Sequence, residues 1–319
     1  MKKATKTGLF FLMMVIFYFV IGLGISSVIP EKYYTVNVLY ILGQMTIIIP
    51  ALAYVLITKG RIFKELPFRK IKIENALILI IFAYVCLPIV GFLNSVTMLF
   101  STNHVASTVG GLTENPFIIN VLMIALLPAF MEEFVFRGII FNGFRKSGIF
   151  AAIIMSSMCF GMFHMNINQF VYAFLMGCVF ALVNEASGSI LGSMIMHFMF
   201  NFNTVVSIQM LKLLPLLNKL AGTSSGKVNT PEINTDLSAM TVQQKVIMIA
   251  VYGVLAVGAT VLNVFIFKWY AKRTGRSEHI KEIFANKSAG FKNSENGRTV
   301  TIPLILAYIV CMVTMVLIN

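Results

Sequence analysis

Residues 117–136 decide the fold; they read FIINVLMIALLPAFMEEFVF, and Arg137 follows directly. About 20 helical residues, rising about 1.5 Å each, cross a hydrocarbon layer of about 30 Å. The charged side chains of this run are Glu132 and Glu133. An ionised group near the centre of a membrane helix costs at least about 2.5–3.5 kcal/mol, so its presence suggests a function. The run predicts a membrane span that contains two carboxylates.

Further apolar runs surround this one. Hydrophobic residues make up 58% of the 319 residues and charged residues 12%, against about 25% charged residues in soluble domains. Such a chain cannot cover a water-facing surface with polar groups, which excludes soluble, disordered and nucleic-acid-binding proteins. We expect an all-α, polytopic membrane helical bundle of about eight to nine transmembrane helices. The runs lie at 8–28, 37–58, 76–100, 117–136, 148–165, 169–186, 189–211, 246–267 and 301–318.

The basic residues predict the orientation. The chain has 25 Lys and Arg against 12 Asp and Glu, a net charge of +13. With the N-terminus inside, all but five of the basic residues fall in inner segments, as is typical of cytoplasmic loops. We expect a multi-pass protein of the cell membrane, that of a bacterium, with a cytoplasmic N-terminus and membrane lipids as partners. The five outer residues are Lys32, Lys212, Lys219, Lys227 and Lys245.

Three regions follow from the order of the runs. Residues 1–116 hold three spans, and residues 117–211 hold four, including both carboxylates. Residues 212–319 hold an outer loop near 219–244, one or two further spans and a basic cytoplasmic segment. A short surface helix is expected in that segment near 278–284.

Two histidines also lie within apolar runs. His164 ends the run 148–165, and Glu132 and His164 are equidistant from Gly148 in the turn between two runs. Two antiparallel helices joined at that turn hold these side chains at similar depth, where they can face each other. His197 lies in the run 189–211 and shares a helix face with Asn201, four residues later.

The second carboxylate has a different expected role. Glu133 and Arg137 are four residues apart in the favourable order for a helical ion pair. We expect Arg137 to neutralise Glu133, while Glu132 points elsewhere around the helix. Glu132 can then meet His164, His197 and Asn201.

This set of groups suits hydrolysis. A partly desolvated carboxylate such as Glu132 can act as a general base, and together with His164 it can activate water. His197 and Asn201 can donate hydrogen bonds to an oxyanion. The alternative is a zinc site formed by Glu132, His164 and His197, although the chain has no HExxH motif. The single Asp of the chain, Asp236, excludes an aspartyl protease dyad.

At these residues the sequence resembles the CPBP family, the CAAX protease and bacteriocin-processing group of intramembrane endopeptidases. Three motifs coincide in the family's order, within residues 117–210, about a third of the chain. Each motif alone is weak, and their ordered combination is specific. The motifs are EExxxR at Glu132-Glu133-Phe134-Val135-Phe136-Arg137, FxxxH at Phe160-Gly161-Met162-Phe163-His164, and HxxxN at His197-Phe198-Met199-Phe200-Asn201.

The resemblance implies a four-helix catalytic core in an all-helical membrane endopeptidase similar to CAAX prenyl endopeptidases. It implies that Glu132 and His164 activate water and that His197 and Asn201 stabilise the oxyanion. The supporting residues on this pattern are Glu133, Arg137 and Phe160. The family carries the label metalloprotease, but the residues suit a glutamate mechanism, so we expect no cofactor and keep zinc as the alternative. The expected substrate is a lipidated protein or peptide precursor that enters from the cytoplasm or the lipid.

Other functions are weighed against this one. Glu133 and Arg137 alone could be a structural ion pair, and an intramembrane His or Asn is often only a packing residue. A non-catalytic bacteriocin self-immunity or scaffold protein would keep the polar groups as a packing network. A proton-relay transporter lacks support because the chain shows no internal repeat. A rhomboid-type serine protease would need a suitably placed later histidine, which Ser187, at the end of a span, lacks.

Overall fold

A computed structural model describes residues 2–28, 30–101, 112, 114–220, 240–287 and 299–318. In this part of the chain the regular elements are all helices, which confirms the predicted all-α class. Seven helices within it are long and apolar enough to cross a membrane. Two shorter apolar helices, Ile149–Phe163 and Ile302–Ile318, correspond to two further predicted runs. The prediction of a polytopic helical bundle is confirmed.

Most observed helices begin and end within a few residues of the predicted runs. The largest differences are two C-terminal extensions: the fourth run, predicted to end at residue 136, continues to Arg145, and the seventh, predicted to end at residue 211, continues to Leu220. The helices are α1 (Lys3–Val28), η1 (Glu31–Tyr33), α2 (Val36–Ile57), α3 (Ile62–Glu65), α4 (Ile73–Thr97), α6 (Phe117–Asn120), η2 (Val121–Leu126), α7 (Leu127–Glu133), η3 (Phe134–Ile140), α8 (Phe141–Arg145), α9 (Ile149–Phe163), α10 (Ile167–Ser187), α11 (Leu191–Leu220), α12 (Val242–Arg273), α13 (Ser277–Ala285) and α14 (Ile302–Ile318).

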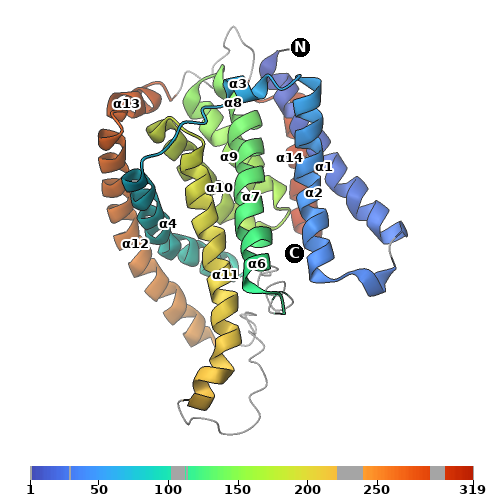
Figure 1. Cartoon of the computed structure of the whole chain (residues 1–319), viewed down its shortest axis with the longest axis vertical. Coiled ribbons are helices and arrows are strands. Elements are labelled where there is room, and N and C mark those ends of the chain that lie inside the picture. Colours follow the sequence, from blue (N-terminus) through green and yellow to red (C-terminus); the bar gives the residue numbers. More distant parts are fainter. Residues whose placement is uncertain are drawn as a thin grey trace.

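The long helices form a single bundle (Figure 1). The N-terminus, α3, α8 and α13 gather at one end, whereas α6 lies toward the other end (Figure 1). Segments that were predicted to be basic and cytoplasmic therefore share one end of the bundle, called the basic end below. The helix α13 confirms the surface helix expected near 278–284. Most of the predicted outer loop 219–244 lies outside the described residues.

The fourth span is not a uniform α-helix. The segments η2 and η3 are π-helical and flank the α-helical α7. Pro128 lies at the start of α7, where its missing N–H removes one donor from the helical hydrogen-bond ladder. Single π-helical turns in membrane and soluble helices are frequent at functional sites. The two carboxylates lie at the end of α7, where the α-helix changes to the second π-helical segment.

A tight turn joins the fourth span to α9. The backbone N–H groups of Ser147 and Gly148 donate to the carbonyls of Phe144 and Arg145. Gly148 has a φ of 129°, a conformation that glycine adopts without a steric penalty. The helices on either side of this turn pack against each other, so the predicted hairpin is confirmed.

The loop between α3 and α4 crosses the basic end and is fixed there. The N–H of Ile190 donates to the carbonyl of Pro67 at 3.1 Å. The hydroxyl of Ser189 donates to the carbonyl of Arg69 at 2.6 Å and accepts from its N–H at 3.2 Å. Gly188, with a φ of 68°, ends α10 and makes this turn possible. The loop is therefore held against the turn between α10 and α11.

Candidate active site

The predicted site residues come from three packed parts of the bundle. The fourth span contributes Glu132 and Glu133 from α7 and Arg137 from η3. α9 ends immediately before His164, which caps it. α11 packs against α7 and carries His197 in its second turn. Residues far apart in sequence are thereby brought to one region.

Glu133 is the centre of a fully buried polar cluster. Its Oε1 accepts a hydrogen bond from Nη1 of Arg137 at 3.0 Å and another from Nδ1 of His197 at 2.9 Å. The side chains of Glu133 and Arg137 are 0% and 1% exposed. The expected ion pair is therefore present. The bond from His197 was not predicted, and it ties α11 to the fourth span.

The guanidinium of Arg137 is held between aromatic rings. Its Cζ lies 4.3 Å from the centroid of the Phe160 ring and 5.3 Å from that of Phe180. Such cation–π contacts stabilise a desolvated cation by about 2 kcal/mol. A Cβ on Gly177 would lie 2.9 Å from Nη2 of Arg137, so glycine leaves room for the guanidinium there. Phe160, expected as a supporting residue, contacts Arg137 and thereby fixes its position.

His164 has a defined ring orientation. Its Nδ1 lies 2.8 Å from the carbonyl oxygen of Phe160, one turn earlier. A carbonyl only accepts hydrogen bonds, so Nδ1 carries a proton and donates it. In the neutral ring, Nε2 then has a free lone pair. The Phe160 ring also packs edge-on against His164, with centroids 5.0 Å apart.

Glu132 lies beside the buried cluster and is partly accessible. Its side chain is 14% exposed, and its Oε2 lies 3.8 Å from Nε2 of His197. That distance is too long for a direct hydrogen bond and suits an intervening polar atom. Glu132 also interacts electrostatically with His164. The two carboxylates differ as expected, because Glu133 is engaged by Arg137 while Glu132 is not.

Asn201 lies one turn after His197 on α11 and is half-buried. Within the part of the chain that the structure describes, its side-chain amide forms no hydrogen bond with Glu132, His164 or His197. The helix places Asn201 on the same face as His197. The structure thus brings Glu132, His164 and His197 into one region and leaves the amide without a polar contact to them.

Sequence reasoning missed a second polar cluster at the basic end. Glu185, near the end of α10, is paired with Arg145, Arg276 and His279. The only signal in the sequence is a single acidic residue near the end of an apolar run, and His279 was given no role. Phe180 and Gly177 were also missed, because apolar and small residues in a span have no distinctive pattern.

The expected alternative of a zinc site can be tested against the ligand arrangement. Among the described residues, no group of three or more His, Cys, Asp or Glu side chains is placed to hold a metal ion. His197 directs Nδ1 to Glu133, and His164 directs Nδ1 to a carbonyl. These contacts leave Nε2 of each ring as the atom available to a metal, as is usual for metal-ligating histidines, and zinc use stays an untested alternative.

The comparisons with known proteins agree with the motifs. Residues 114–203 match the model of a family described as type II CAAX prenyl endopeptidase Rce1-like. This segment contains all the motif residues. No curated protein and no solved structure matches the chain.

The bundle is that of a multi-pass membrane protein, and its matched segment resembles membrane proteases. Residues 114–203, about a quarter of the chain, are similar to the CAAX protease family. The remaining spans lie outside the matched segment. Catalytic roles and substrate are therefore matters for proposal.

Proposed function

We propose that the chain is an intramembrane endopeptidase that hydrolyses a peptide bond with a water molecule activated by Glu132 and His164. The observation that carries this proposal is the difference between the two adjacent carboxylates. Glu133 is fully buried and neutralised by Arg137. Glu132 is partly accessible and interacts with His164. One carboxylate thus fixes the site and the other is available for chemistry.

Water activation follows from the orientation of His164. Because Nδ1 donates to the carbonyl of Phe160, Nε2 presents a lone pair. A water molecule between Nε2 and the Glu132 carboxylate loses a proton to one of these bases as its oxygen attacks the carbonyl carbon. The same group then returns the proton to the leaving amine. The products are a new carboxylate and a new amine, and no covalent enzyme intermediate is required.

The oxyanion needs donors opposite the attacking water. His197 donates from Nδ1 to Glu133, so its Nε2 donates toward the oxyanion only when the ring carries both protons. The amide of Asn201, on the same face of α11, supplies a second donor.

The substrate we propose is a lipidated protein or a peptide precursor, reaching the site from the basic end or from the lipid. Hydrogen bonds link several helices at the opposite end of the bundle. Asn115 exchanges hydrogen bonds with Asn37 at 2.9 and 2.7 Å, and its Nδ2 donates to Asn120 at 3.0 Å. Lys212 donates to the backbone carbonyl of Asn115. These bonds link α2, α6 and α11, which supports access from elsewhere.

The decisive experiment is cleavage of a synthetic prenylated CAAX peptide, and of a peptide precursor, by purified protein in detergent or nanodiscs. Glu132→Gln removes the base while preserving size. We expect kcat/KM to fall at least about a hundredfold, because general-base catalysis contributes about 10²–10⁴-fold. The matched control is Glu278→Gln, an exposed carboxylate paired with Lys281 on α13, which should retain full activity.

The same variants distinguish the rival functions. Full cleavage by Glu132→Gln would refute the glutamate mechanism. A self-immunity or scaffold protein would show no cleavage by the wild type and full cellular function in Glu132→Gln. A chelator and metal analysis address the zinc alternative. We expect activity to persist after chelation, and loss that only added zinc restores would establish a metalloprotease.

A further inference from the structure

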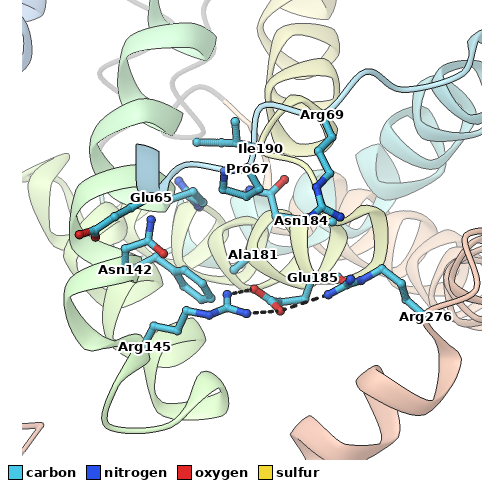
Figure 2. Close-up of a pocket in the computed structure, with 13 residues that line it drawn as sticks. Glu65, Pro67, Arg69, Asn142, Arg145, Ala181, Asn184, Glu185, Ile190 and Arg276 are labelled. Carbon is cyan, nitrogen blue, oxygen red and sulfur yellow. Dashed lines mark hydrogen bonds and ion pairs between the residues drawn. The ribbon is translucent and has the colours of Figure 1, made fainter. Parts of the chain in front are cut away.

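A pocket opens at the basic end of the bundle, where three segments meet. Its volume is about 300 Å³. The loop before α4 contributes Arg69, the end of α8 contributes Arg145, and the link between α12 and α13 contributes Arg276. Figure 2 shows Arg145 and Arg276 approaching Glu185 from different sides. None of the four proposed catalytic residues lines this pocket.

The charge of the pocket lining is predominantly positive. The lining contains four arginines and two glutamates. Glu185 is shared by Arg145, Arg276 and His279, so one carboxylate faces several cations. The other lining glutamate, Glu65, is paired with Lys3 at 3.1 Å. The fixed carboxylates thus leave positive charge uncompensated.

Some buried hydrogen-bond donors in the pocket lining also have no partner among the described residues. Arg137 lines the pocket, and its side chain is 1% exposed. Its Nη1 binds Glu133, but Nε and Nη2 have no hydrogen-bond partner among the described residues. The same holds for Nδ2 of Asn142, which lines the pocket one turn further along. Buried N–H groups without acceptors are costly, so they point to an acceptor that binds there.

Arg69 adds a further free cation. Its backbone is fixed by Ser189. Its guanidinium forms no ion pair or hydrogen bond with the residues that the structure describes. Figure 2 shows this side chain extending from the loop toward Asn184 on the pocket wall. Arg69 is therefore held in place at the pocket but not neutralised.

We propose that this pocket binds a phosphate group. Glu185 already supplies a planar carboxylate to Arg145 and Arg276, so the remaining donors require further acceptor oxygens in other directions. A tetrahedral phosphate provides these, and guanidinium groups bind it with paired hydrogen bonds. The group belongs either to an anionic lipid head or to a free phosphate compound, since the pocket lies at the end of the bundle where head groups are found.

Binding can be measured on the full chain independently of proteolysis. In one arm, inorganic phosphate is titrated into protein in phosphatidylcholine nanodiscs, with potassium chloride at equal ionic strength as the reference. In the other arm, part of the phosphatidylcholine is replaced by phosphatidylglycerol. The measured quantity is the thermal unfolding midpoint. Arg69→Gln removes a cation that has no partner among the described residues, so the fold should be preserved. Lys72→Gln is the matched control from the same segment, outside the pocket lining.

We expect phosphate, phosphatidylglycerol or both to raise the midpoint of the wild type. Arg69→Gln should weaken phosphate binding about tenfold, the effect of one charge-assisted hydrogen bond. Stabilisation by phosphate in phosphatidylcholine identifies a free phosphate compound, and stabilisation by phosphatidylglycerol alone identifies a lipid head group. The proposal is wrong if neither exceeds the chloride reference, or if Lys72→Gln weakens binding as much as Arg69→Gln.

Discussion

Two clusters in this molecule are built from the same residue types, a glutamate with arginine and histidine. In the site cluster, Glu133 binds Arg137 and His197. In the basic-end cluster, Glu185 binds Arg145 and His279, and also Arg276. Each joins helices that are distant in sequence.

The two clusters differ in their contact with solvent. Arg137 is 1% exposed, whereas Arg145 is 38% and His279 26% exposed. A charge that is shielded from water is stabilised only by its partners in the protein, whereas an exposed charge keeps part of its hydration. The same residue types can therefore form a fully buried network in one place and a partly hydrated one in another.

Removing the carboxylate of the site cluster should have the larger effect. In Glu133→Gln the guanidinium of Arg137 stays buried without a counter-charge. We expect the free energy of unfolding to fall by about 3–5 kcal/mol, as is typical when one partner of a buried pair is lost. Reversible denaturation in mixed detergent and dodecyl sulfate measures this change.

The double variant Glu133→Leu with Arg137→Met is the control for that interpretation. It removes both charges and fills the space with apolar groups, which is often neutral for a buried pair. We expect it to regain more than half of the lost stability but no cleavage, since His197 loses its acceptor. If the double variant is no more stable than Glu133→Gln, the unpaired buried charge is not the cause of the stability loss in Glu133→Gln.

The basic-end cluster should tolerate the equivalent change better. In Glu185→Gln, the cations Arg145, Arg276 and His279 remain partly hydrated. We expect a loss of about 1–2 kcal/mol in the same denaturation experiment. Glu278→Gln, in a pair that is mostly exposed, should change stability by less than about 0.5 kcal/mol. A loss for Glu185→Gln as large as that for Glu133→Gln would contradict the comparison.

The sequence predicted much of this arrangement. Long apolar runs predict the spans, and the turn at Gly148 predicts the hairpin. Both features are predictable because they depend on residues that are close together in the sequence. The i,i+4 spacing gives the pair of Glu133 and Arg137 for the same reason. The assignment of catalytic roles to Glu132, His164, His197 and Asn201 stays a prediction, since placement alone does not test it.

Other features were not predictable because they depend on contacts between distant segments. The bond from His197 to Glu133 joins residues on different helices, and no spacing rule specifies which helices become neighbours. The partners of Glu185 come from the end of α8 and from the segment after α12. The π-helical segments η2 and η3 change the hydrogen-bond register without changing hydropathy. Hydropathy alone therefore predicts an ordinary α-helix there.

Salt concentration should change the stability contributions of the two clusters to different extents, and this is the smallest effect that we expect. At about 1 M salt the Debye length is about 3 Å, so attractions between exposed charges are largely screened, and buried ones much less. The stability difference between the wild type and Glu185→Gln should shrink by about 0.5 kcal/mol between 0.1 and 1 M potassium chloride, because Arg145 and His279 are accessible to ions. The difference for Glu133→Gln should stay constant within about 0.3 kcal/mol, since the side chain of Arg137 is only 1% exposed and its ion pair with Glu133 is screened little. Equal salt dependence of both differences would mean that the site cluster is hydrated, and the division of roles between the two adjacent carboxylates would lose its physical basis.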